Sequence, residues 1–517
     1  MFITLKKRFI NEAGELNVLA ESLAIVALFV LSVVVVYLSP KGFDRIFFGL
    51  TFVFFWFSKR NYFWFAFYII IFLTPGGFFV ESSAEATRRI PIFTLFPKAS
   101  FSVFDIFLIV ALFKAIFKGV SRRYKDVFNY KLMLAVVVGL FLISFYHEMS
   151  VNTFFNRTLR GTFYYTLAYS FPALIFKKKD LYKFMYLFFP FVFFEIFTQI
   201  YLLQTGVDFI TNFNPELTLT AGREDELIGG LRLVANGYVI VISSFIFSFV
   251  FLDNPERLSP RSYILAVTAI SALSILLSAT RQSIIMIGFM FVLYFLLTGK
   301  RKSGYVIQFS FVLLILFLLI DFADVFDLNK MIKGSFNRLT GAVVVEGGEI
   351  VAENSLAYRL EYRLPKLMAA FEENPFLGYG FSDKFYEVYD GHLGGVIVGL
   401  LQAGIIGYIF YIYFIIRLFR VIIFYQRKFR KRKISYSEPL KVMVIGLTGY
   451  LLVNAVIEPV FIYNISYRPQ GFFLLVLLSY VFIHNGIDEY KLKKQTLIKL
   501  SNRKQALTET ATTINSK

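Results

Sequence analysis

Long apolar runs recur along the chain and are separated by short polar segments. An α-helix needs about 20 mostly apolar residues to cross a hydrocarbon core roughly 30 Å thick. The sequence contains about fourteen runs near that length, at 20–38, 44–57, 61–74, 101–117, 130–147, 161–176, 182–203, 230–252, 262–279, 283–298, 304–321, 393–417, 440–460 and 470–485. The pattern predicts an all-α polytopic membrane protein with about 12 to 14 transmembrane helices, built as one membrane domain over residues 1–517.

Composition supports this class. Hydrophobic residues make up 57% of the chain and charged residues only 17%, whereas soluble domains carry about 25% charged residues. The chain has no cysteine, which excludes disulfides, thiolate metal sites and cysteine nucleophiles.

The distribution of positive charge predicts the orientation. If the N-terminus is cytoplasmic, the basic clusters fall on the cytoplasmic side, at Lys59–Arg60, 118–125, Lys177–Lys179, Arg257 and Arg261, Lys300–Lys302, Arg427–Lys433 and the basic tail 486–517. The loop 322–391 falls on the other side and carries eleven acids against seven bases. We therefore expect both termini in the cytoplasm, and we assign the net charge of +19 to topology and lipid headgroups rather than to nucleic acid.

The loop 322–391 is the longest polar segment, and loops of this length are often functional. Leucine and phenylalanine recur at helical spacing over 356–371, which predicts an amphipathic helix at the outer membrane interface, either kinked at Pro365 or divided there into two short helices. Asn374–Pro375 is expected to end the helical part, and Gly378–Gly380 to form a turn.

Several cationic side chains and one histidine are candidates for chemistry on that side. Arg281 lies in a short junction between two apolar runs, where a charge is costly and often functional. Arg359 and Arg363 are spaced to share a helix face and to bind phosphate oxygens; snorkelling or an ion pair with a nearby glutamate is the structural alternative. His392 has a pKa suited to a general base, or is a polar interface residue.

Weaker candidates complete the set. Arg160, Arg223 and Arg232 are placed to line a cationic vestibule for substrate. Glu195 lies inside an apolar run, where it either relays protons or bonds a neighbouring helix. We see no compact metal-ligand motif and no glycine-rich nucleotide loop, so we expect chemistry without metal or cofactor.

Taken in order, these motifs resemble the O-antigen ligase and O-antigen polymerase superfamily of bacterial surface-polysaccharide assembly. The pattern extends over 265–420 and consists of Ser278, Thr280 and Arg281 between two spans, R-L-E at Arg359–Glu361, N-P-x-x-G-x-G from Asn374 to Gly380, His392, and G-I-I-G at Gly404–Gly407. The chain departs from the family in two places. Leu393 follows His392 where the family usually has asparagine, and Tyr362–Arg363 stand where a tryptophan is common, which leaves the choice between Arg359 and Arg363 open.

The resemblance implies a metal-independent, inverting glycosyltransferase of the GT-C type in the bacterial inner membrane. Its donor would be an undecaprenyl-diphosphate-linked oligosaccharide at the outer leaflet, and its active site would be extracytoplasmic. Arg281 and Arg359 would stabilise the diphosphate, and His392 would deprotonate the acceptor hydroxyl. Partners implied are membrane lipids and other assembly proteins, such as a flippase or a chain-length regulator.

Three functions are compatible with the sequence. The first is a polymerase that joins repeat units of an O-antigen, capsule or exopolysaccharide. The second is a ligase that transfers the glycan to lipid A-core or protein. The third, a lipid-linked oligosaccharide flippase or other transporter, would predict charges within spans and an internal repeat, and the sequence shows few of the former and none of the latter.

Overall fold

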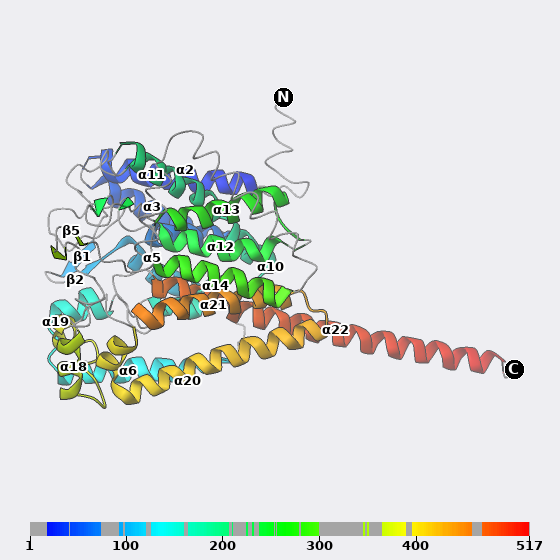
Figure 1. Ribbon diagram of the computed structural model, residues 1–517. Coiled ribbons are helices and arrows are strands. Elements are labelled where there is room, and N and C mark those ends of the chain that lie inside the picture. The colour runs from blue at the N-terminus through cyan, green and yellow to red at the C-terminus, as the bar shows by residue number, and fades with distance from the viewer. Residues whose placement is uncertain are drawn as a thin grey trace, which may run out of the picture.

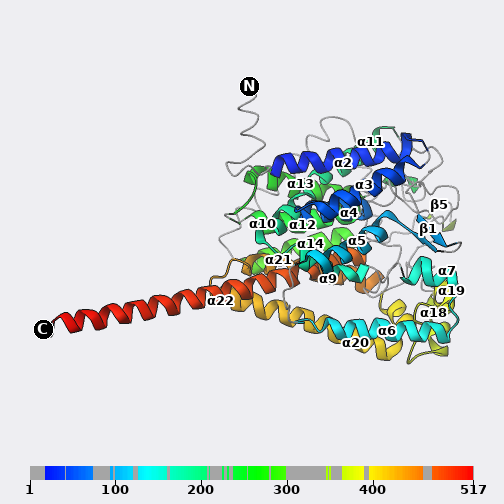
Figure 2. The same ribbon diagram turned by 180° about the vertical axis from the view of Figure 1, so that it is seen from behind.

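The computed structural model describes residues 18–40, 42–73, 93–96, 99–119, 126–159, 164–205, 209, 224–225, 230–231, 237–252, 254, 256–278, 281–298, 345–346, 349–350, 364–388, 395–457 and 468–515. The described chain is almost entirely helical, and its long helices lie side by side in one bundle (Figures 1 and 2). A helix occupies each predicted apolar run except 304–321, which lies outside the described residues.

The helices follow the chain in this order: α2 (Val18–Leu38), α3 (Phe43–Phe57), α4 (Asn61–Leu73), α5 (Val103–Lys118), α6 (Tyr130–Tyr146), α7 (Val151–Thr153), α9 (Leu167–Leu174), α10 (Lys178–Tyr186), α11 (Phe189–Thr205), α12 (Tyr238–Leu252), α13 (Arg261–Leu277), α14 (Arg281–Thr298), α18 (Leu364–Glu373), α19 (Asp383–Val388), α20 (Gly395–Lys431), α21 (Ser437–Ile457) and α22 (Arg468–Asn515). A π-helix, η1 (Phe154–Leu159), follows α7, and a 3₁₀ turn, η2 (Tyr164–Thr166), precedes α9.

The described residues contain three short antiparallel hairpins. Strand β1 (Phe93–Phe96) pairs with β2 (Ala99–Phe101), β3 (Glu224–Asp225) with β4 (Gly230–Leu231), and β5 (Val345–Glu346) with β6 (Glu349–Ile350). The hairpin β1–β2 and strand β5 lie at the same end of the bundle as α18 and α19 (Figure 1). We call this end the loop end, and the end from which α22 projects the tail end.

Several helices are suited to a bilayer by length and composition. Among the described residues, four are long and apolar enough to cross a membrane: Val18–Leu38, Lys178–Leu202, Val396–Lys431 and Gly471–Ser501. Shorter apolar helices accompany them at Asn61–Leu73, Lys131–Tyr146, Val239–Leu252, Arg261–Leu277 and Ile285–Tyr294. The polytopic class is therefore supported, while the number of spans stays a prediction.

Aromatic side chains fill much of the bundle core. Phe104 stacks on Phe72 with ring centroids 4.0 Å apart, and Phe107 stacks on Tyr68 at 4.2 Å. Offset aromatic pairs of this kind contribute about 0.5–1.5 kcal/mol each beyond their buried area. The high phenylalanine content of the sequence thus serves helix packing.

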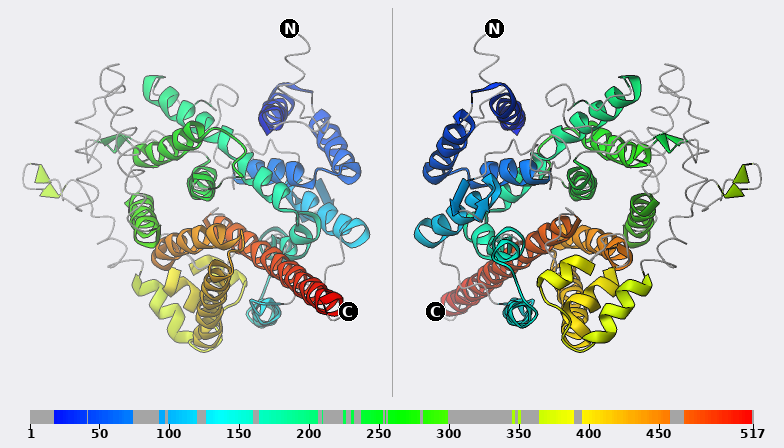
Figure 3. Two further views of the ribbon diagram at one scale, coloured as in Figure 1. Left: turned by 90° about the vertical axis from the view of Figure 1, so that its right-hand side faces the viewer. Right: turned by 90° about the vertical axis from the view of Figure 1, so that its left-hand side faces the viewer.

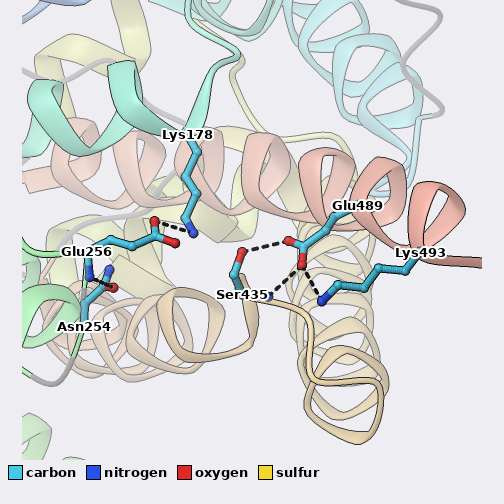
Figure 4. A network of polar contacts seen from close by, with 6 residues as sticks. All are labelled: Lys178, Asn254, Glu256, Ser435, Glu489 and Lys493. Carbon is cyan, nitrogen blue, oxygen red and sulfur yellow. Dashed lines mark hydrogen bonds and ion pairs between the residues drawn. The ribbon is translucent and has the colours of Figure 1, made fainter. Parts of the chain in front are cut away.

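Polar contacts at the tail end join segments that the charge pattern assigns to one side. Lys178 pairs with Glu256 at 2.6 Å, and the Ser435 hydroxyl donates to Glu489 at 2.7 Å (Figure 4). Lys493 also pairs with Glu489, at 2.8 Å. The segments near 178, 256, 435 and 489 therefore share one end of the bundle, as the alternation of basic loops predicts.

One ion pair is buried among α2, α4 and α10. The Nζ of Lys183 lies 2.8 Å from Oε1 of Glu21, and the Tyr62 hydroxyl donates to the same oxygen at 2.6 Å. All three residues are at most 5% exposed. In this apolar setting each charge depends on the other, because neither has water to replace its partner.

Replacing Lys183 with methionine is expected to lower the free energy of unfolding by about 3–5 kcal/mol, because Glu21 would be left as a buried unpaired charge. The matched control is Lys178→Met, which removes a lysine from the more exposed pair with Glu256 and should cost less than about 1 kcal/mol. Denaturant unfolding in detergent measures both. Equal losses from the two substitutions would contradict the buried pair.

Four predictions need correction or extension. Pro365 is the second residue of α18, where its missing N–H has no intrahelical partner to lose, and the part of the predicted helix before Leu364 lies outside the described residues. The run 182–203 is divided into α10 and α11, because Pro190 favours a new helix start. The run 393–417 is only part of α20, and the tail 486–515 continues α22 as helix.

Candidate active site at the loop end of the bundle

Helix α20 is broken at Gly404, whose backbone is non-helical (φ 59°, ψ −176°). The break releases carbonyl groups before it and N–H groups after it. Residues 375–380 satisfy them: Ile405 N–H donates to Pro375 O at 2.9 Å and Ile406 N–H to Phe376 O at 3.2 Å, while Tyr379 N–H donates to Leu401 O at 3.0 Å and Gly380 N–H to Gln402 O at 2.8 Å. Within a bilayer, unpaired groups would each cost several kcal/mol. We call residues 374–383 the latch.

Three glycines make the close approach of latch and helix possible. Gly378 (φ 68°), Gly380 (φ 60°) and Gly404 (φ 59°) all have the left-handed conformation that disfavours other residues. A Cβ at Gly404 would overlap the Phe376 carbonyl, and one at Gly378 would overlap the backbone of Gln402. The predicted turn at Gly378–Gly380 is therefore confirmed, and its glycines are required for conformation and for space.

The latch is also bound to the end of α6. The Phe381 N–H donates to the Ser144 hydroxyl at 2.5 Å, and the Asp383 N–H donates to Glu148 O at 3.2 Å. The carboxylate of Asp383 accepts hydrogen bonds from the Ser150 N–H at 2.6 Å and from the Thr153 hydroxyl. These contacts connect three elements at one edge of the bundle, where α18, α19 and α20 gather (Figure 3).

A polar cluster surrounds the buried ring of Tyr379. Its hydroxyl lies 2.9 Å from Ala370 O and 2.8 Å from Glu373 Oε2, and Lys384 pairs with the same Glu373 oxygen. The hydrogen bonds from Lys384 and Tyr379 hold the pKa of Glu373 below its usual value. The His147 ring contacts the Tyr379 ring at 5.0 Å, and desolvation together with nearby Lys384 lowers the pKa of His147.

The second part of the site is the junction between α13 and α14. Ser278 is buried at the end of α13, and its hydroxyl donates to Ile275 O at 2.7 Å. The amide of Gln199, on α11, donates to Ser274 O at 2.9 Å in the last turn of α13. These contacts hold the end of α13 in place. Two residues, Ala279 and Thr280, separate Ser278 from Arg281.

Arg281 is the first residue of α14. A helix N-terminus carries partial positive charge and free N–H groups, which favour a phosphate or other anion. Because α14 begins with a cationic residue, charge and helix dipole act in the same direction at this junction. The side chain of Arg281 lies outside the described part of the chain.

The other predicted residues also lie outside the described ranges: His392, Arg359, Arg363, Arg160, Arg223 and Arg232. Their roles stay predictions. The described elements next to them are nevertheless informative, since α18 begins at the residue after Arg363 and α20 begins three residues after His392. The latch therefore lies in the sequence between Arg363 and His392.

Glu195 is described and lies close to the same end. It is 1% exposed on α11, one helical turn before Gln199, and a Cβ at Gly237 would collide with its carboxylate. An acid at this depth is unusual and commonly functional. Among the described residues, no group of three or more His, Cys, Asp or Glu could hold a metal ion.

Some residues of the site were not predicted from the sequence. Asp383, Ser144 and Tyr379 bind the latch to its neighbours, yet none belongs to a motif that marks such a role. Gly404 was noted only as part of the G-I-I-G motif, and nothing in that motif indicates a break in the helix. Gly378 and Gly380 predicted a turn, but they did not predict that the turn contacts α20.

Comparison with known proteins supplies the family. Residues 266–412 match the family model described as O-Antigen ligase, and no curated protein matches the chain. The matched region contains most of α13, the Arg281 junction, the latch and the break in α20. The match over residues 266–412 therefore supports the O-antigen ligase and polymerase superfamily, which the motifs predict.

Proposed function

We propose that the protein is an inner-membrane glycosyltransferase that polymerises undecaprenyl-diphosphate-linked repeat units of a bacterial surface polysaccharide, with its loop end extracytoplasmic. The observation that carries the proposal is the O-Antigen ligase match, which includes both Arg281 at the start of α14 and the latch before α20. A GT-C type arrangement, as the family resemblance implies, is part of this proposal.

The proposed chemistry is a single displacement with inversion. The acceptor hydroxyl oxygen attacks the anomeric carbon of the donor, and the bond from that carbon to the diphosphate oxygen breaks. The diphosphate leaves with the electron pair, and His392 takes the proton from the attacking hydroxyl. No nucleotide is consumed, since the glycosyl diphosphate itself is the activated donor.

Arg281 and Arg359 are assigned to the leaving group. Negative charge on the diphosphate increases as the bond breaks, and preorganised guanidinium groups at a site of low dielectric stabilise that charge. The N-terminus of α14 contributes in the same sense. Arg363, Arg160, Arg223 and Arg232 are assigned to binding the remainder of the donor or acceptor.

Transfer of a finished glycan to lipid A-core or protein is the second candidate, and the same family match supports it equally. A deletion strain distinguishes the two. Loss of the polymerase should leave a single repeat unit on the final acceptor, while loss of a ligase should leave intact polymer on the lipid carrier. Purified protein that forms no glycosidic bond from lipid-linked oligosaccharide with any acceptor would contradict both.

A further inference from the structure

Helix α20 presents an exposed stripe that changes from apolar to cationic toward the tail end. The apolar members of the stripe are Ile409, Tyr413, Ile416 and Phe424, which are 60%, 45%, 46% and 59% exposed. Arg420, Arg427 and Lys431 are also exposed and continue the same spacing. Because residues three and four apart share a helix face, one side of α20 combines a surface for acyl chains with a surface for an anion.

The apolar part of the stripe is long enough for a lipid of one leaflet. Helix α20 is one of the described helices that could cross a membrane, and only 22% of its apolar window is buried. From Ile409 to Phe424 the stripe extends for roughly 22 Å at 1.5 Å per residue, whereas one leaflet occupies about half of a 30 Å hydrocarbon core. In a bilayer, lipid headgroups would therefore lie near its tail-end limit.

The cationic end of α20 has no counter-charge among the described residues. Six exposed cations lie within seven positions: Arg427, Lys428, Arg430, Lys431, Arg432 and Lys433. No carboxylate in the described part of the chain forms an ion pair with any of them. At the same end, Lys178 and Lys493 are paired with glutamates (Figure 4). Like charges this close repel one another, so an external anion would stabilise them.

Helix α22 holds part of this charge beside the stripe. The centre of the Tyr490 ring lies 5.4 Å from Lys428 Nζ and 5.9 Å from the guanidinium carbon of Arg432. The two helices are in close contact here, since a Cβ at Gly486 would overlap the ring of Phe429. They lie side by side where α22 leaves the bundle (Figures 1 and 2). Cation–π contacts of this kind keep the positive charge at the end of the apolar stripe.

We propose that this end of α20 binds an anionic phospholipid. The phosphate contacts Arg427 and Lys431, and an acyl chain follows the stripe past Phe424. A guanidinium can bind two phosphate oxygens at once, and the lysine adds a second point charge. Arg420 lies about 10 Å nearer the loop end along the helix, a position from which long arginine side chains extend toward the headgroups. A zwitterionic lipid carries its own ammonium group and gains less from these cations.

Lipid binding by the full-length protein tests the proposal. Purified protein is mixed with phosphatidylglycerol or phosphatidylcholine, and native mass spectrometry counts the lipids that each molecule retains. Replacing both Arg427→Gln and Lys431→Gln is expected to reduce retained phosphatidylglycerol severalfold and to leave retained phosphatidylcholine unchanged. Arg427→Gln alone should give a smaller loss in the same direction.

The matched control replaces both Lys178→Gln and Lys493→Gln. It removes the same charge from the same end of the bundle, but from lysines that glutamates already neutralise. This protein should retain phosphatidylglycerol as the natural protein does. Thermal unfolding in phosphatidylcholine establishes that the compared proteins are folded.

Three results would overturn the proposal. Equal losses from the two double variants would show that net charge, and not this stripe, attracts the lipid. Full retention by the Arg427→Gln and Lys431→Gln protein would exclude the site. Complete displacement of phosphatidylglycerol by inorganic phosphate would identify the occupant as a free anion. The readout is bound lipid and not glycan synthesis, so it is independent of the proposed function.

Discussion

Replacement of Arg281 by alanine is expected to reduce glycosidic-bond formation by roughly 100- to 1,000-fold, the usual effect of removing one donor that stabilises developing charge. Arg281 begins α14, so its loss removes the guanidinium from a helix N-terminus that is otherwise suited to the diphosphate. Arg359→Ala should have a similar effect. Initial rates with purified protein and lipid-linked oligosaccharide measure both.

Two controls sharpen this experiment. Arg261→Ala removes an arginine from the opposite end of α13 and should leave the rate near that of the natural protein. Arg281→Lys retains the charge but not the planar fork, so an intermediate rate is expected. If Arg281→Ala protein is folded and turns over at the natural rate, the assignment of the diphosphate to this junction is wrong.

Substitution of Gly404 by alanine is expected to abolish most of the activity and to destabilise the protein by more than about 1–2 kcal/mol, the cost of left-handed backbone alone in a non-glycine residue. The added methyl group would also overlap the Phe376 carbonyl, which is one of the four backbone partners across the break. Thermal unfolding in detergent and turnover report the two effects.

The matched control is Gly139→Ala in α6, where a Cβ would meet no atom within 4 Å. Alanine has the higher helix propensity, so this change should be neutral or slightly stabilising. Gly378→Ala should reproduce the defect of Gly404→Ala, because it acts on the other side of the same contact. A Gly404→Ala protein as stable as Gly139→Ala would show that α20 is not held in its broken form.

Most of the helices could be predicted from the sequence because membrane helices leave a strong local signal. Each apolar run such as 61–74 or 262–279 is satisfied by its own backbone hydrogen bonds, so its position depends little on other parts of the chain. Boundaries were less accurate where polar residues continue a helix into water, as in α20 and α22. Hydropathy identifies the part of a helix that lies in the membrane, but it does not identify where the helix ends.

The candidate site was only partly predictable, for a different reason. The Gly378–Gly380 turn is a local feature and was found. The contacts of Asp383 with Ser150 and Thr153, and of Ser144 with Phe381, join residues more than 200 positions apart. A single sequence contains no periodicity that indicates such pairs, because the same polar residue types also occur at loop ends where they make no such contact.

The break in α20 has a consequence for biosynthesis. Until its freed carbonyl and N–H groups are paired, the segment around Gly404 is costly to place in lipid, so α20 cannot settle at its final depth unaided. Every partner that satisfies the break or holds the latch precedes α20 in the chain: α6, α7, α18 and the latch itself. Because the chain is synthesised from its N-terminus, these partners are made first. The groups that pair with the broken helix are therefore already present when α20 leaves the ribosome.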